Sequence, residues 1–126
     1  MSTTSGATAS RITPQVEEAS AIEVVCPTGQ TTVIITDMPS IHAETVDVVV
    51  TSDEDISAQL VNKAAYGKLA LTSTLGTVTG GNTNGYVYGQ AGTGPLRNPV
   101  GVSCSLQIVN SSGSDATVTA WLCARS

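Results

Sequence analysis

The sequence predicts an all-β domain, either an antiparallel β-sandwich or a jelly roll. Short runs of Val, Ile and Thr recur along the chain, turn-forming clusters separate them at regular intervals, and several runs alternate apolar with polar residues. The 126 residues are enough for one domain with one modest core. Because the chain contains no Phe and a single Trp, that core has to be built from aliphatic side chains.

The chain divides into an extended N-terminal arm, residues 1–19, and a single sandwich domain, residues 20–126. The arm is rich in Ser, Thr and Ala and shows no hydrophobic periodicity, so it is either a disordered terminus or a segment that orders against a neighbouring subunit. It lacks the apolar stretch of a secretory signal, and no run in the chain reaches the length of a membrane span. We therefore expect residence in a cytosol-like compartment and no membrane partner.

The first half of the domain begins with strand signals at residues 21–26 and 31–36, which end at turn-forming clusters and are spaced as a hairpin. Residues 44–51 are the most strand-like run, because three valines alternate with other residues. Residues 56–66 fit a strand or a helix, and we predict a helical turn because Ile56, Leu60 and Ala64 fall on one helical face. A strand is expected over the alternating residues 68–80.

The second half ends in two clearly alternating runs, residues 100–110 and 116–124, joined by a five-residue turn. If Ile108 lies opposite Val118, the apolar residues of both runs share one face, and we predict a hairpin. The three cysteines are widely spaced and odd in number, which indicates buried thiols rather than a disulfide framework. They are Cys26, Cys104 and Cys123.

A long Gly-rich stretch, residues 80–101, is expected to be a surface loop with one very short strand at most. It does not match a phosphate-binding loop, since Pro95 and Leu96 stand where Lys and Ser or Thr are required. Long loops in compact domains are usually functional or disordered, and Tyr and Arg are enriched at binding hot spots. We predict a contact loop whose binding residues are Tyr86, Tyr88, Leu96 and Arg97.

Two more candidate contacts lie outside the loop. One is the part of the arm around Arg11 and Ile12. The other is Trp121, which lies on the outward face of the last strand if the alternating apolar residues face inward. An outward Trp marks an interface, or else it is covered by the arm or by a second sheet.

No catalytic, cofactor or metal site is predicted. The acidic trio Asp53, Glu54 and Asp55 lacks the spacing of a calcium loop and fits a solvated turn. His42 is the only histidine, so any zinc site or catalytic base would depend on it alone, and no G-x-S-x-G elbow occurs. The net charge of −5 and the scattered basic residues argue against nucleic-acid binding.

The polar arm, the strands rich in Ser, Thr, Val and Gly, and the closing segment SLQIVNSSGSDATVTAWLCA resemble small virion structural proteins of tailed bacteriophages, of the head decoration or cement type. The resemblance implies a non-enzymatic subunit that is assembled in the host cytoplasm, forms homo-oligomers and binds the major capsid protein or other virion subunits. A coat, tail or fibre component would look much the same. A β-sandwich module that binds a glycan or a protein is the other function class that stays open.

Overall fold

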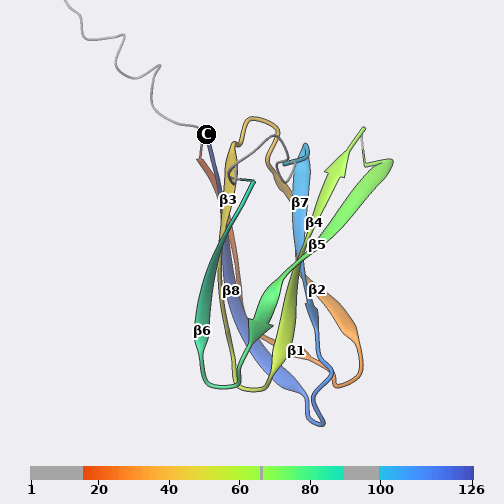
Figure 1. Ribbon diagram of the computed structural model, residues 1–126, viewed down its shortest axis with the longest axis vertical. Coiled ribbons are helices and arrows are strands. Elements are labelled where there is room, and N and C mark those ends of the chain that lie inside the picture. Colours follow the sequence, from red (N-terminus) through yellow and green to blue (C-terminus); the bar gives the residue numbers. More distant parts are fainter. Residues whose placement is uncertain (1–15, 66, 90–99) are drawn as a thin grey trace, which may run out of the picture.

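The computed structural model describes residues 16–65, 67–89 and 100–126, which form eight strands in two four-stranded sheets (Figure 1). The predicted all-β class is confirmed. The described residues contain no helix, so none that could cross a membrane. The strands are β1 (Val16–Cys26), β2 (Thr31–Pro39), β3 (Thr45–Ser52), β4 (Ile56–Ala64), β5 (Leu69–Val78), β6 (Thr83–Tyr88), β7 (Ser103–Val109) and β8 (Ala116–Arg125).

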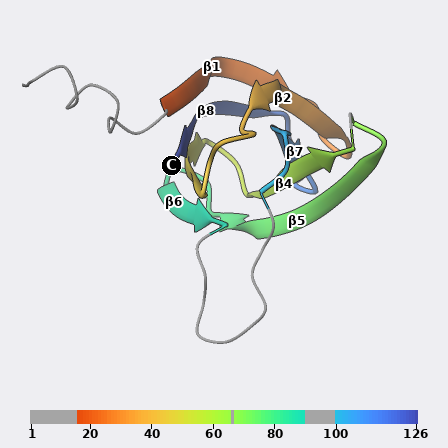
Figure 2. The ribbon, with the colours of Figure 1, turned by 90° about the horizontal axis from the view of Figure 1, so that it is seen from above.

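The strand order identifies the fold as a jelly roll. One sheet runs β1-β8-β3-β6 and the other runs β2-β7-β4-β5, with every pair antiparallel. Among the described strands, only β4 and β5 are neighbours both in sequence and in a sheet, so the chain otherwise passes from one sheet to the other at each turn. Figure 2 shows the two sheets facing each other, with β1 and β2 on one side and β5 and β6 on the other.

The core lies between the sheets and is filled by small aliphatic side chains from both inner faces. In β3 the alternation predicted by the sequence is confirmed, because Val46, Val48 and Val50 are all fully buried. β4, β7 and β8 contribute in the same period of two. The largest fully buried side chains among these three strands are Leu60, Leu106, Ile108 and Leu122.

Both predicted hairpins are wrong. β1 pairs with β8, whereas β2 pairs with β7, so the runs at 21–26 and 31–36 lie in different sheets. Ile108 pairs with Thr32 and Ala58, while Val118 lies in the opposite sheet beside Val24. The inward direction of the apolar residues is nevertheless as expected, because alternation determines the face of a strand without determining its partner.

The helical turn predicted for residues 56–66 is also wrong, because residues 56–64 form β4. Ile56, Ala58 and Leu60 are buried and alternate with half-buried residues, which is the period of a strand. β4 lies between β5 and β7, so its backbone groups are bonded on both sides. Just before β4, the hydroxyl of Ser52 accepts a hydrogen bond from the backbone N–H of Glu54 at 3.2 Å, which shapes the turn out of β3.

The boundaries at the arm and the Gly-rich stretch change as well. β1 begins at Val16, so residues 16–19, which the sequence assigned to the arm, belong to a strand. The stretch 80–101 is not one loop, because β6 occupies residues 83–88 and its ladder with β3 is regular. Residues 1–15 and 90–99 lie outside the described residues, and so do the predicted contacts Arg11, Ile12, Leu96 and Arg97.

The β1–β2 and β7–β8 loops lie at the lower end of the sandwich in Figure 1, and Asn110 joins them. It is fully buried, and its side-chain amide donates to the carbonyl oxygens of Cys26 and Ser114, each at 2.9 Å. Its side-chain oxygen accepts from the backbone N–H of Ser112 at 3.0 Å. Its own backbone exchanges hydrogen bonds with Gly29 and Gln30. One residue therefore holds the β1–β2 loop against the β7–β8 loop.

We expect Asn110→Ala to lower the free energy of unfolding by about 2–4 kcal/mol, because buried carbonyl groups lose their donor. Urea denaturation measures the change. Ser111→Ala is the matched control, since Ser111 is exposed in the same loop and should shift stability by less than about 0.5 kcal/mol. Equal stability of the two variants would show that Asn110 does not hold the loops together.

The cysteines are free and buried, as the sequence indicated. Cys104 lies on the inner face of β7 and is fully buried. Burial raises the pKa of its thiol to about 11, and a hydrogen bond with Ser40 offsets only part of that rise. In the unfolded chain a cysteine thiol ionises near pH 8.5, roughly its ordinary value.

We expect alkaline pH to destabilise the fold through Cys104. As the pH rises from about 8.5 towards 11, the unfolded chain releases the thiol proton while the folded chain keeps it, so folding stability falls. Urea midpoints at pH 8 and about pH 10.5 should differ more in the unchanged protein than in Cys104→Ala, which lacks this thiol. The same pH dependence in both proteins would contradict the assignment.

Candidate interaction surface

The outer face of the β1-β8-β3-β6 sheet is organised in rows that cross all four strands. The antiparallel registers align Glu18, Cys123, Asp47 and Val87 in one row. The next row towards the lower end aligns Ser20, Trp121, Val49 and Gly85, and the one after it brings Thr119, Thr51 and Thr83 beside a bulge in β1. On β8, β3 and β6 these two lower rows carry only uncharged side chains, whereas charged residues lie at the upper border and at Glu23 in the β1 bulge.

The bulge in β1 lies at Ile22 and Glu23. Pairing with β8 is regular up to Ala21 and resumes at Val24, so two residues stand opposite Thr119. Glu23 adopts a φ of 50°, which is uncommon for a residue with a Cβ and costs about 1 kcal/mol. Its backbone N–H donates to the Thr119 hydroxyl at 2.9 Å. As a result, the side chain of Ile22 is 73% exposed beside the outer face.

Trp121 stands in the middle of this face, on β8, as predicted from the alternation of the last strand. It is half-buried, and its indole N–H donates to Oε1 of Glu18 at 3.0 Å. Its neighbour on β3 is Val49, which is 39% exposed. None of the described residues covers the ring from outside the sheet. Within the described part of the chain, Trp121 is therefore covered neither by the arm nor by a second sheet.

Beside Trp121 the face forms a shallow hollow of about 240 Å³. Gly85 lies beside this hollow, because the row of Trp121 and Val49 ends in a residue with no side chain. A Cβ added at Gly85 would have no neighbour closer than the Val48 carbonyl oxygen, at 3.8 Å. The lining of the hollow includes Ile22, Val49, Thr51, Thr83, Thr119 and Trp121.

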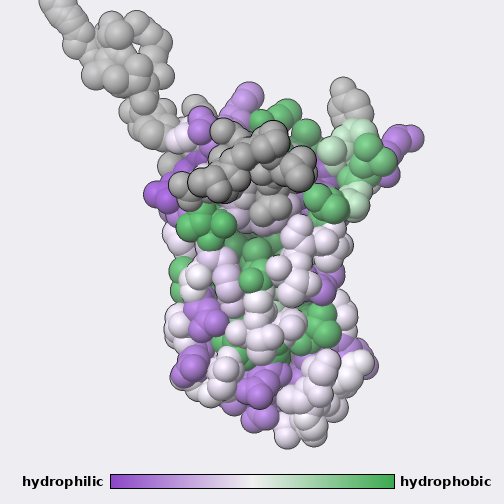
Figure 3. Space-filling model, in the orientation of Figure 1, coloured by the Kyte–Doolittle hydropathy of each residue, from purple (hydrophilic) through white to green (hydrophobic). Residues whose placement is uncertain are grey.

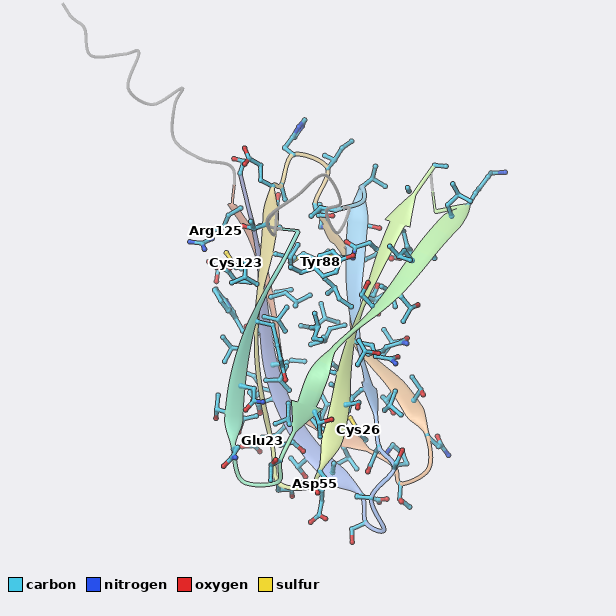
Figure 4. The ribbon with its side chains drawn as sticks, in the orientation of Figure 1. Glu23, Cys26, Asp55, Tyr88, Cys123 and Arg125 are labelled. Carbon is cyan, nitrogen blue, oxygen red and sulfur yellow. The ribbon has the colours of Figure 1, made fainter. Side chains whose placement is uncertain are left out.

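Charged groups lie along the upper border of the face. The guanidinium of Arg125 contacts Oδ2 of Asp47 at 2.5 Å, and Figure 4 shows Arg125 and Cys123 on the outer side of the sheet. The other carboxylate oxygen of Asp47, Oδ1, is buried without a hydrogen-bond partner among the described residues. Glu18 lies in the same row, so this border carries more negative than positive charge.

The two tyrosines predicted as loop contacts point inward instead. Tyr88 is 2% exposed, its hydroxyl lies 3.2 Å from that of Ser73, and Figure 4 shows it between the sheets. Tyr86 is half-buried against the core, with its hydroxyl accepting from the Asn84 amide at 3.2 Å. Between them Val87 is 57% exposed on the outer face. The side chain of Tyr88 is therefore unavailable to a partner of the folded domain.

A second group of exposed apolar side chains lies at the upper end of the other sheet, where β4 and β5 meet. Leu69 is 65% exposed and Leu71 is 47% exposed, and Figure 3 shows green side chains in this region. Asn62 lines a hollow together with these two leucines, and its amide Nδ2 is buried without a hydrogen-bond partner among the described residues. Alternation predicted the strand, but did not indicate that its leucines would stay exposed.

The residues considered as metal ligands or catalytic groups do not lie together in the described part of the chain. No three His, Cys, Asp or Glu side chains there are placed to hold a metal ion. Two members of the acidic trio support loops, since Asp53 accepts from the Thr117 N–H and Asp55 from the Gly80 N–H, both at 2.8 Å. His42 is exposed in the β2–β3 loop.

Comparison with known proteins gives a likeness of fold. No protein-family model and no curated protein matches the chain. A chain of the infectious bursal disease virus VP2 subviral particle matches with a TM-score of 0.58 and 13% identity, covering 89% of this chain and 32% of that chain. Chains of the Gx and Gt strains of the same virus give TM-scores of 0.55 and 0.54 at 17% and 18% identity, covering 89% of this chain and 32% and 33% of theirs. The chain thus spans about a third of the length of the viral chains that share its jelly roll.

Proposed function

We propose that this chain is a non-enzymatic structural subunit of a virus particle, which stabilises a capsid shell through contacts between subunits. The observation that carries the proposal is the outer face of the β1-β8-β3-β6 sheet, where a bulge exposes Ile22 beside a half-buried Trp121 and an open hollow. Bulges are retained where they redirect a side chain, and uncovered apolar faces mark interaction sites.

The scaffold supports the same proposal. Jelly rolls are frequent in viral capsid proteins, although lectins and cupins share them, and the fold alone does not specify a function. The likeness to a VP2 subviral particle adds weight to the capsid role. A weakly charged sheet face suits a repeated contact, because a standard interface buries about 800 Å² per partner and many modest contacts in one particle combine as avidity.

The finer role that we propose is a decoration or accessory subunit on the shell of a tailed bacteriophage. It rests on the resemblance of the sequence to head decoration proteins. Its partners would be the major capsid protein and further copies of the same chain, its location would be the virion, and assembly would take place in the host cytoplasm. No membrane or nucleic-acid partner is proposed.

The proposal is tested by fractionating the native source on a sucrose gradient and then on a density gradient. We expect the chain to travel with megadalton particles through both steps, because stable incorporation survives dilution. Quantitative mass spectrometry of the particle then separates the finer roles. A second, larger shell protein in a fixed ratio to this chain supports decoration, whereas this chain as the main shell protein means a coat subunit.

Recovery of the chain only in the slow, soluble fraction would overturn the virion proposal. A free binding module for a glycan or a protein would then be the better interpretation. Tail or fibre fragments that carry the chain without a shell would overturn the capsid role while leaving a structural one.

A further inference from the structure

We propose that the hollow on the outer face of the β1-β8-β3-β6 sheet binds the segment around Arg11 and Ile12 from a second copy of the chain. The inference deepens the proposed subunit assembly, and it rests on that assembly for the second copy. It assigns an occupant to a face that no described residue covers. It also names the residues on each side of the contact.

The shape and chemistry of the hollow suit a short extended segment that is mainly polar. Ile22 forms a raised apolar wall on β1, while the missing side chain at Gly85 leaves the β6 side open. Threonines on β3, β6 and β8 form the row below Val49 and Trp121, so the hollow offers hydroxyl groups to a backbone and an apolar floor to a side chain. The sequence ASRITP, residues 9–14, has one large apolar side chain, Ile12, between polar neighbours.

Charge favours the same pairing. All ten acidic residues of the chain lie in the described part, which has only three of the five basic ones. Residues 1–15 contain no Asp or Glu, and Arg11 is their one charged side chain. Glu18 and Glu23 are exposed on the β1 side of the hollow, and Asp47 keeps one buried carboxylate oxygen without a partner among the described residues. A guanidinium next to Ile12 would therefore meet negative charge at the rim.

The reach of the chain indicates a second copy rather than the same one. Ile12 lies four positions before Val16, the start of β1, and four residue steps span at most ~14 Å when fully extended. Thr83, at the far side of the hollow, lies three strand spacings across the sheet and about six residues down it, roughly 24 Å from Val16. Ile12 of the same chain falls short of that position by about 10 Å.

Cysteine cross-linking tests the contact in the full-length chain. The test variant combines Ile12→Cys with Thr83→Cys, and the control combines Ile12→Cys with Val33→Cys. Val33 is 50% exposed on the opposite sheet, and the three native cysteines are buried. After mild oxidation, non-reducing gels should show disulfide-linked dimers and larger multimers roughly tenfold more abundant in the test variant, because docking raises the effective concentration.

The reaction is run both on gradient-purified particles and on the free chain at high concentration, so the inference and the proposed function can fail separately. Equal cross-linking in the two variants, or a disulfide formed within one chain, would overturn the inference. Particles without the specific cross-link would leave the structural role standing. A specific cross-link in a chain that is absent from particles would support the contact and remove the virion role.

A second pair of variants checks the hollow without new cysteines. Gly85→Leu places a side chain beside the hollow, next to Val49 in the same row, and a Cβ at Gly85 has no neighbour closer than 3.8 Å. Gly113→Leu is the matched control, because a Cβ there meets nothing within 4 Å and the residue lies in the β7–β8 loop. We expect self-association to weaken by roughly tenfold in Gly85→Leu alone, with the thermal midpoints of both variants unchanged. Equal association of the two variants would contradict the inference.

Discussion

The whole domain depends on packing two sheets through small aliphatic side chains. The chain has no Phe, so the space between the inner faces is filled by many Val, Leu, Ile and Ala side chains, each of which buries a modest apolar area. Such a core is stable only when the two faces interdigitate closely. A slip of one residue would turn an inner face outward, so packing fixes the register of every strand. The same register fixes the rows on the outer face.

The sequence predicted the direction of side chains better than the partners of strands. Alternation along β3, β7 and β8 identified the residues on their inner faces, because a side-chain period of two is a local property, but it did not indicate that Ser105 and Cys123 on the outer faces are buried as well. Pairing is not local in a jelly roll, since β1 meets β8 from the other end of the chain. The hairpins inferred from sequence neighbours therefore failed. β4 was misread because Ile56, Leu60 and Ala64 suit a helical face as well as a strand, and its two neighbouring strands decide the outcome.

The candidate surface was predictable in part. The outward position of Trp121 followed from the alternation of β8. Ile22 could not be found in the same way, because a bulge interrupts the alternation and the run AIEVVC contains no Gly or Pro to signal it. The tyrosines were misplaced because the Gly-rich composition of residues 80–101 suggested a loop. In a strand the side chains alternate between the two faces, so in β6 Tyr86 and Tyr88 point inward and Val87 points outward.

The outer face shows how such a chain can associate without strong ion pairs. Burying Ser and Thr hydroxyls that find partners costs less free energy than burying charges, so a face with a largely uncharged centre can be covered at a modest cost. Three acidic residues, Glu18, Glu23 and Asp47, lie around that centre, and the net charge of −5 opposes the approach of identical copies at long range. At physiological salt this repulsion is screened beyond about 8 Å, whereas contacts within the hollow are not. In the proposed contact, shape at the bulge and the hollow would therefore determine which surfaces remain together, and charge would determine how readily the copies approach.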